Sequence, residues 1–279
     1  MKKYLFLIAL LWIAGCASAA PELKETASPT RPAPAVDKNL ITAHRGSSGT
    51  APENTLASFR KAVDDGAGYS ELDVQETADG AIMVMHDDSV RRTTGIPKYM
   101  WEIRSDELKE ASAGAWYGAQ FQSEKVPTLQ EVIAEVRGKT KLNIELKNNG
   151  HERQLAEKTV KIIEDAGFMK DCTVTSFDPR LIHRVRALDR AIKTGLIVDK
   201  KPAEWDKLLQ SDDYDVISSA YPLIDPAFMR MAAQHRKEVY AWTVNDKVLM
   251  AKMLDLGVNS IITNYPDRLV QLLQQRSER

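Results

Sequence analysis

Residues 40–74 read LITAHRGSSGTAPENTLASFRKAVDDGAGYSELDV and contain the clearest indication of the fold. A short β-rich run at 40–44 is followed by an amphipathic helical pattern at 54–65 and by a second β-rich run at 69–74. A strand, a helix and a second strand in this order predict two parallel strands joined by a crossover helix. The stretch therefore predicts one unit of an α/β fold.

The same alternation continues to the end of the chain. We predict strands at 40–44, 69–74, 141–146, 172–176, 193–198, 216–220, 238–244 and 260–263. Helical patterns between them include 54–65, 128–137, 152–165, 179–188, 226–235, 247–256 and 267–274. Eight strands separated by helices predict a TIM (β/α)₈ barrel, and an open doubly wound sheet is the alternative. Because no glycine-rich phosphate loop follows the first strand, we favour the barrel.

One interval departs from this alternation, between the second strand and the strand at 141–146. It contains an extra β-rich run at 81–85, which the turn residues Asp79 and Gly80 join to the second strand as a hairpin or bent extension. The mixed stretch at about 87–126 predicts a small insertion. Because loops at the C-terminal ends of barrel strands build the active site, we expect this insertion to form a wall of it.

The size and charge of the chain limit the classes of partner. The chain has 279 residues, and one barrel of this kind needs about 250. It carries 38 Lys and Arg residues against 39 Asp and Glu residues. A nucleic-acid-binding protein would have an excess of basic residues, so we expect no nucleic-acid partner. Any phosphate chemistry must depend on local charge.

The N-terminal residues MKKYLFLIALLWIAGC predict export. Two lysines before a short apolar run are typical of a signal peptide, here residues 1–15. The run Ile-Ala-Gly-Cys resembles a bacterial lipoprotein box, which predicts lipidation of Cys16 and anchoring in a membrane of the cell envelope. An ordinary secretory signal with an incidental cysteine is the alternative. Residues 16–38, rich in Pro and Ala, predict a linker, and residues 39–279 the barrel domain.

Acidic residues lie on neighbouring predicted strands. Glu71 and Asp73 are two residues apart on the second strand, so both side chains point to the same side. Glu145 lies at an equivalent depth on the next barrel strand. Three carboxylates in one barrel repel one another unless a cation joins them, and an all-oxygen set selects a hard ion. We therefore predict one divalent cation, Ca²⁺ or Mg²⁺, with surface ion pairs as the alternative for individual residues.

Two histidines lie at strand ends that would meet at the same barrel mouth. His44 is followed by Arg45, His86 ends the extra run, and Lys147 follows the strand of Glu145. A metal and a guanidinium can neutralise a phosphoryl group, while one imidazole removes a proton from the nucleophile and another protonates the leaving oxygen. The set therefore predicts cleavage of a phosphodiester.

Several other residues are weaker candidates. His183 and His235 lie in helical patterns and are expected at the surface, whereas His151 follows a loop on the active-site side and remains a weak candidate. Glu53 is equally consistent with a border of the site and with no role in it. Trp242, at a strand end, fits either barrel packing or an apolar wall for the substrate.

Six stretches of the chain resemble the glycerophosphodiester phosphodiesterase family, in order and at suitable spacing. They are AHRGSSGTAPENT (43–55), ELDVQETADGAIMVMHD (71–87), LNIELKNNG (142–150), TSFDP (175–179), AWTVN (241–245) and ITNYPD (262–267). The resemblance implies a TIM barrel with a small insertion after the second strand. One departure is the run Gly66, Ala67, Gly68, where the family usually has an acidic third residue.

The resemblance also implies roles for individual residues. His44 and His86 are implied as the acid/base pair, Arg45 as a phosphate contact, Lys147 as supporting positive charge, and Trp242 as a residue near the substrate. The three carboxylates are implied as the metal ligands.

Local charges indicate which histidine would be the base. The positive charge of Arg45 disfavours a second proton on His44, whereas Asp87 and Asp88 favour the protonated form of His86 if their side chains come near. These charges alone make His44 the base and His86 the acid, although metal charge and burial could reverse the order.

The predicted activity is hydrolysis of a small molecule, an sn-glycerol 3-phosphodiester, to glycerol 3-phosphate and an alcohol. The resemblance implies attack by the glycerol 2-hydroxyl, with direct attack by water as the alternative. A lysophospholipase D-type phosphodiesterase on the same scaffold is the main rival. A non-catalytic envelope-binding lipoprotein is a second rival, but every expected catalytic and metal position is filled.

Overall fold

The computed structural model describes Met1 and residues 36–278. The predicted signal peptide, Cys16 and most of the predicted linker therefore lie outside the described residues. Among the described helices, none combines the length and the apolar character needed to cross a membrane.

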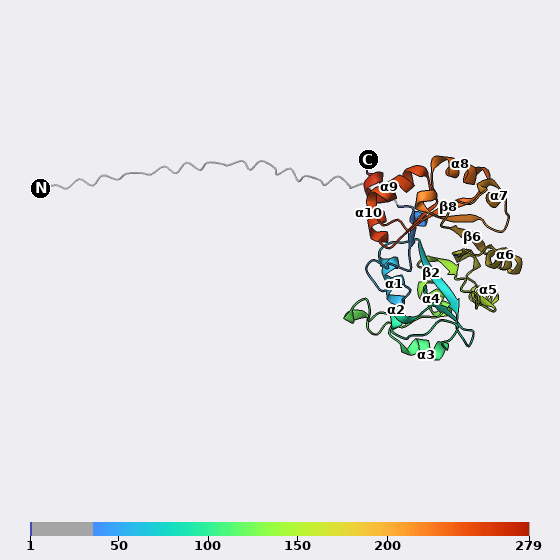
Figure 1. The fold of residues 1–279 in the computed structure, drawn as a ribbon. Helices are drawn as coiled ribbons and strands as arrows, with labels where there is room; N and C mark the ends of the chain where they lie inside the picture. Colours follow the sequence, from blue (N-terminus) through green and yellow to red (C-terminus); the bar gives the residue numbers. More distant parts are fainter. Residues whose placement is uncertain (2–35, 279) are drawn as a thin grey trace. The chain divides into compact units, whose positions relative to one another are not determined.

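Eight parallel strands form a closed barrel, which confirms the predicted fold (Figure 1). The order around the barrel is β1-β9-β8-β7-β6-β5-β4-β2, and β1 pairs with both β9 and β2. A further strand, β3, pairs antiparallel with β2 and forms the predicted hairpin. The strands are β1 Ile41–Ala43, β2 Tyr69–Glu76, β3 Ile82–Val84, β4 Lys141–Leu146, β5 Cys172–Ser176, β6 Lys193–Val198, β7 Val216–Ala220, β8 Glu238–Trp242 and β9 Ser260–Thr263.

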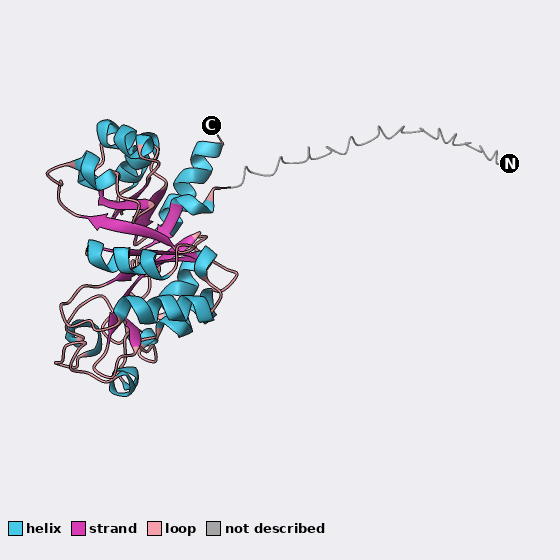
Figure 2. Cartoon of the chain, turned by 90° about the vertical axis from the view of Figure 1, so that its right-hand side faces the viewer, coloured by secondary structure: helices cyan, strands magenta, loops and turns pink. Residues whose placement is uncertain are grey.

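Helices cover the outside of the barrel (Figure 2). All seven predicted helices are present, and the sequence pattern missed three short ones, α2, α3 and α7, which have too few turns to show a helical period. The helices are α1 Leu56–Asp64, α2 Arg91–Thr94, α3 Ser105–Glu110, α4 Leu129–Val136, α5 Leu155–Asp165, α6 Pro179–Leu188, α7 Trp205–Leu209, α8 Pro226–Gln234, α9 Lys247–Leu256 and α10 Pro266–Ser277.

Strand β2 shows how the core and the functional interior are separated. Its even-numbered residues Leu72 and Val74 belong to an apolar cluster that includes Phe59 of α1 and Val132 of α4. Because side chains alternate along a strand, the odd-numbered residues point to the opposite face, into the barrel. Burial of the apolar face against the helices therefore fixes which β2 side chains reach the barrel interior.

The insertion after β3 contains α2 and α3 and lies beside the barrel (Figure 1). It has a small apolar core of its own, formed by Met83, Met85, Val90, Met100, Ile103, Leu108, Ala113 and Val126. Since Met83 and Met85 come from the β3 segment, this core attaches the insertion to the segment that carries His86.

Candidate active site

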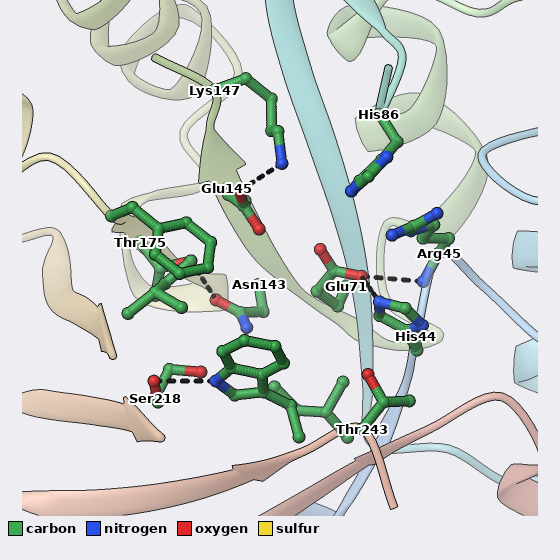
Figure 3. A pocket seen from close by; sticks show the side chains of 14 residues that line it. His44, Arg45, Glu71, His86, Asn143, Glu145, Lys147, Thr175, Ser218 and Thr243 are labelled. Atoms are coloured by element: carbon green, nitrogen blue, oxygen red, sulfur yellow. Dashed lines mark hydrogen bonds and ion pairs between the residues drawn. The ribbon is translucent and has the colours of Figure 1, made fainter. Parts of the chain in front are cut away.

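A pocket of about 140 Å³ opens at the C-terminal ends of the barrel strands (Figure 3). Seven of the predicted site residues line it: His44, Arg45, Glu71, His86, Glu145, Lys147 and Trp242. The eighth, Asp73, is buried beside them on β2. The structure therefore brings all the predicted catalytic, metal-binding and substrate-binding residues of the barrel to one place.

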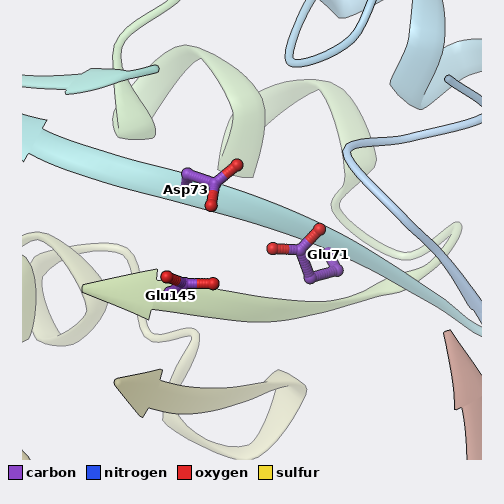
Figure 4. A group of neighbouring side chains, drawn as sticks. All are labelled: Glu71, Asp73 and Glu145. Carbon is purple, nitrogen blue, oxygen red and sulfur yellow. The ribbon is translucent and has the colours of Figure 1, made fainter. Parts of the chain in front are cut away.

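Three carboxylates lie close together on β2 and β4 (Figure 4). Asp73 is directly opposite Glu145 in the parallel register, and Glu71 is two residues earlier on β2. Each of the three offers an oxygen, and these atoms all lie within 4.8 Å of one another. Burial, followed by the charges of Asp73 and Glu145, raises the pKa of Glu71. Burial and Asp73 raise the pKa of Glu145 to about 7.

This cluster fits a hard divalent cation. Oxygens bound to one Ca²⁺ at about 2.4 Å can lie at most about 4.8 Å apart, which agrees with the spacing of the three carboxylate oxygens. Burial and, after it, the charges of the neighbouring carboxylates raise the pKa of Glu71 and Glu145, and a bound cation would favour the ionised form of both. Glu71, Asp73 and Glu145 are therefore the residues that could hold the metal.

Two cationic side chains flank the carboxylates. Arg45 Nε lies 3.5 Å from Asp73 Oδ2, and Arg45 Nη1 donates to Glu53 Oε1 at 3.0 Å. Lys147 Nζ donates to Glu145 Oε1 at 2.8 Å and lies 3.7 Å from Asp73 Oδ1. Although burial opposes it, the charge of Arg45 and then that of Lys147 lower the pKa of Asp73. The site thus offers positive charge for a phosphate beside negative charge for a metal, and Glu53 does border it.

His44 is held at the end of β1 by a residue that follows β9. Its Nδ1 lies 2.7 Å from Asn264 Oδ1, and its Nε2 lies 4.0 Å from Glu71 Oε2. Because an amide oxygen only accepts, His44 Nδ1 carries the proton and Nε2 is the free basic nitrogen. Burial, followed by the charge of Arg45, lowers the pKa of His44 to about 4. A neutral imidazole with a free Nε2 is suited to remove a proton.

The Asn264→Ala variant is expected to hydrolyse its substrate about 10-fold more slowly, because His44 loses the acceptor that fixes its tautomer and ring orientation. Asn264→Asp keeps an acceptor at this position and should retain more activity than Asn264→Ala. Steady-state kinetics of the two variants provide the measurement. Equal activities for Asn264→Ala and the wild type would contradict this role.

His86 follows β3 and is fixed from two sides. Its Nδ1 lies 2.7 Å from Asp87 Oδ1, so the side-chain proximity that the sequence left open is present. Its main chain is held by buried Gln75, whose Nε2 donates to the carbonyls of Met85, His86 and Asp87 at 3.0, 3.2 and 2.9 Å. Burial opposes ionisation of Asp87, but bonds from Arg92 and His86 lower its pKa to about 2. Asp87 and Gln75 thus hold the side chain and the main chain of His86 in a defined orientation.

An aromatic wall faces the charged groups. Trp242 Nε1 donates to the Ser218 carbonyl at 2.9 Å, which fixes the indole (Figure 3). The ring of Phe177 meets it edge-on with centroids 5.8 Å apart. Trp242 therefore packs in the barrel and also lines the pocket, and its contact with the substrate stays a prediction.

Several supporting residues were not predicted from the sequence. Asn54 donates to Asp73 Oδ2 at 2.9 Å, and the next residue, Thr55, caps the N-terminus of α1. Gln75 continues the alternation of Glu71 and Asp73 on one face of β2, and that spacing of polar residues was the available signal. Asn264 lies within the quoted stretch 262–267, but nothing local relates it to His44.

One expectation about the surroundings of the site was wrong, and one weak candidate lies outside the pocket lining. No residue of 87–126 lines the pocket among the residues described, so the insertion does not form its wall. It packs behind His86 instead, because its core is built on the β3 segment. His151 also stays outside the pocket lining and stacks on Trp101 of the insertion, with ring centroids 4.0 Å apart.

The fold and the site together define a class of enzyme. At the C-terminal ends of its strands the TIM barrel carries two histidines, three clustered carboxylates and two positively charged side chains. These are the groups needed for metal-assisted cleavage of a phosphodiester. Comparisons with known proteins agree with this class and narrow it.

Residues 44–268 match the model of the glycerophosphoryl diester phosphodiesterase family. A glycerophosphodiester phosphodiesterase of Caldanaerobacter subterraneus is 34% identical over 245 residues, which cover 85% of this chain and 99% of that protein. One from Bacillus altitudinis is 32% identical over 247 residues, covering 84% and 98%. The chain belongs to the glycerophosphoryl diester phosphodiesterase family and is an enzyme of that type.

Solved structures show the same likeness. A phosphodiesterase of Oleispira antarctica, solved in complex with the product sn-glycerol-3-phosphate, has 31% identity and a TM-score of 0.79, covering 84% of this chain and 96% of that one. A glycerophosphodiester phosphodiesterase of Agrobacterium tumefaciens has 25% identity and a TM-score of 0.74, covering 83% and 98%.

Proposed function

We propose that this protein hydrolyses sn-glycerol 3-phosphodiesters to glycerol 3-phosphate and an alcohol, with a divalent cation, Ca²⁺ or Mg²⁺, bound by Glu71, Asp73 and Glu145. The observation that carries the proposal is the convergence of these carboxylates with His44 and His86 in one pocket. Membership of the family and the product bound to the Oleispira antarctica relative support the choice of substrate.

The two histidines divide the proton transfers in this proposal. His44 presents an unprotonated Nε2 beside Glu71, so it removes the proton of the attacking hydroxyl, either the glycerol 2-hydroxyl or water. His86 has its Nδ1 engaged by Asp87, and Figure 3 shows a ring nitrogen pointing into the pocket. From there it donates a proton to the leaving alkoxide. Attack by water gives glycerol 3-phosphate directly, whereas attack by the 2-hydroxyl gives a cyclic phosphate that a water molecule then opens to glycerol 3-phosphate. These assignments agree with the local charges read from the sequence.

The remaining groups neutralise and orient the phosphodiester. When bound, the cation supplies positive charge that polarises the phosphoryl oxygens. Arg45 and Lys147 add positive charge on the protein side and hold the phosphate in place. Trp242 and Phe177 provide an apolar surface for the carbon atoms of glycerol or of the leaving alcohol.

The volume of the pocket favours a small substrate. About 140 Å³ suits a glycerol phosphate group with a short alcohol, whereas a lysophospholipid also needs an apolar groove for its acyl chain. We therefore place glycerophosphodiesters ahead of lysophospholipids as substrates of this site.

Product release from three substrates tests the proposed function. The purified full-length protein is chelated, supplied with Ca²⁺ or Mg²⁺, and assayed with glycerophosphocholine, glycerophosphoethanolamine and lysophosphatidylcholine. We expect glycerol 3-phosphate from the first two, only when a cation is present. Faster cleavage of lysophosphatidylcholine would favour the lysophospholipase D-type activity, and no cleavage of any of them would favour a binding protein.

We also propose that the protein is exported and anchored in the cell envelope through lipidated Cys16, on the basis of the sequence alone. The Cys16→Ser variant is expected to lose the diacylglycerol modification and to appear in the soluble envelope fraction or to stall as the uncleaved precursor. Mass spectrometry of the N-terminal peptide and membrane fractionation provide the measurements. A wild-type protein without lipid would contradict the proposal.

A further inference from the structure

Arg92, in helix α2 of the insertion, lies between two carboxylates beside the active site. Its Nη1 and Nη2 donate to the two carboxylate oxygens of Glu53 at 2.9 and 2.7 Å. Its Nε and Nη2 donate to Asp87 Oδ2 and Oδ1 at 2.6 and 3.1 Å. Both edges of the planar guanidinium therefore bind a carboxylate in a bidentate manner, which fixes the three groups relative to one another.

Each of these carboxylates in turn holds one residue of the proposed mechanism. Asp87 Oδ1 accepts a hydrogen bond from His86 Nδ1 at 2.7 Å. Glu53 Oε1 accepts one from Arg45 Nη1 at 3.0 Å. A continuous chain of charged groups thus connects the proposed acid, His86, with the proposed phosphate contact, Arg45, and Arg92 is its central member.

A second residue of the insertion covers Arg92. The Arg92 guanidinium carbon lies 5.6 Å from the centroid of the Trp116 ring, and Trp116 Nε1 donates to the Ala113 carbonyl at 2.9 Å. A cation over an aromatic face is attracted to it, so the ring favours the observed position of the arginine. The insertion, whose residues are absent from the described lining of the pocket, therefore contacts the groups around the site through Asp87 and Arg92.

We propose that Arg92 is a positioning residue that orients His86 and Arg45 together; the inference rests on the function proposed above. Arg92 holds the Asp87 carboxylate in the position from which it engages His86 Nδ1. With Nδ1 engaged, the other nitrogen of His86 faces the leaving oxygen. The same guanidinium keeps Glu53 against Arg45. Loss of Arg92 leaves the carboxylates of the proposed metal site in place. It removes the constraint on the orientation of His86, the proposed acid, and on that of Arg45, the proposed phosphate contact.

The Arg92→Met variant tests this role through two substrates that differ in their leaving group. Glycerophosphocholine needs an acid to protonate its leaving oxygen, whereas a nitrophenyl glycerophosphodiester needs little such help. We expect kcat to fall about 10- to 100-fold with glycerophosphocholine and much less with the nitrophenyl substrate. KM should rise for both, because Arg45 meets the phosphate of each. Arg92→Lys should restore only part of the loss, since an ammonium cannot bind two carboxylates in a bidentate manner.

Neighbouring Arg91, exposed in the same helix, provides the matched control. Arg91→Met should behave as the wild type with both substrates, and thermal unfolding is recorded for every variant. If Arg92 only attaches the insertion to the barrel, Arg92→Met loses activity equally with both substrates and in step with its stability. That result, or unchanged kinetics, overturns the proposal.

Two further outcomes are distinguishable. If Arg92→Met does not fold, Asp87→Asn is used for the test, because it removes the charge that Arg92 binds while keeping an oxygen for His86. We expect the same dependence of activity on the leaving group. A loss of activity that does not depend on the leaving group overturns the proposal. A wild-type protein that releases no glycerol 3-phosphate refutes the proposed function and this inference with it. If the wild type is active but the variants lose the same share of activity with both leaving groups, this inference alone is refuted.

Discussion

The Glu145→Gln protein is expected to hydrolyse glycerophosphodiesters at least about 100-fold more slowly than the wild type. Glu145 offers an oxygen within 4.8 Å of those of Glu71 and Asp73. The amide keeps the shape of the side chain, and its oxygen can still accept from Lys147. It removes one of the three negative charges, however, so the affinity for a divalent cation falls and the phosphoryl group loses positive charge.

The same substitution is expected to stabilise the metal-free protein. Burial and Asp73 raise the pKa of Glu145 from 4.5 to about 7, so its ionised form is less favourable in the folded state than in the unfolded state. The free energy of unfolding of the metal-free wild type therefore decreases as the pH rises from 4.5 to about 7. A neutral glutamine removes this part of the decrease. Added cation should stabilise the wild type and have little effect on Glu145→Gln.

Thermal unfolding of chelated and cation-loaded protein, between about pH 5 and pH 8, measures these effects. Glu76, at the end of β2, provides the control because it is a buried carboxylate with good partners. It pairs with Lys158 at 2.7 Å and accepts from the backbone amides of Arg153 and Gln154 at 2.8 and 2.9 Å. Glu76→Gln should destabilise the protein and keep the response to cation. A metal-free Glu145→Gln protein less stable than the wild type would contradict the prediction.

The His86→Ala protein is expected to lose roughly 100- to 10,000-fold in kcat with glycerophosphocholine and to recover most of it with a nitrophenyl leaving group. The choline alkoxide is a poor leaving group, so its departure needs a proton. In the proposed mechanism that proton comes from His86, whose Nδ1 lies 2.7 Å from Asp87 Oδ1. Nitrophenolate leaves without one, so the loss of the acid matters much less.

His44→Ala should lose activity of the same order with both substrates. In the proposed mechanism His44 acts on the nucleophile, and a better leaving group does not replace the removal of a proton from the attacking hydroxyl. Kinetics of both variants with both substrates give four values that separate the roles. Recovery of His44→Ala but not of His86→Ala would reverse the assignment, and recovery of neither would show that each histidine does more than transfer one proton.

The barrel and the centre of the site could be predicted because both follow from local spacing. The strand–helix period repeats in the sequence, and parallel strands place their C-terminal ends at one mouth. Glu71 and Asp73 are two residues apart, and the register sets Asp73 opposite Glu145, as their equal depth in the sequence predicted. These residues need only their own strands to be positioned.

The supporting groups could not be predicted because they depend on contacts between distant or irregular segments. Asn264 lies 220 residues after His44, and only the closure of the barrel brings them together. Arg92 lies in a four-residue helix whose position is set by the core of the insertion rather than by any periodic pattern. For the same reason the sequence could not show that this insertion packs behind His86 and not over the pocket.

The contact between His44 and Asn264 has a consequence for how the enzyme is made. The first strand and the loop after the last strand meet here, and the His44 amide also donates to the Thr263 carbonyl at 2.8 Å. During synthesis the N-terminal half of the site emerges from the ribosome long before Asn264 does. A partly folded chain in which β9 has not yet paired with β1 therefore has no acceptor for His44 Nδ1, so the proposed base is oriented only when the barrel closes.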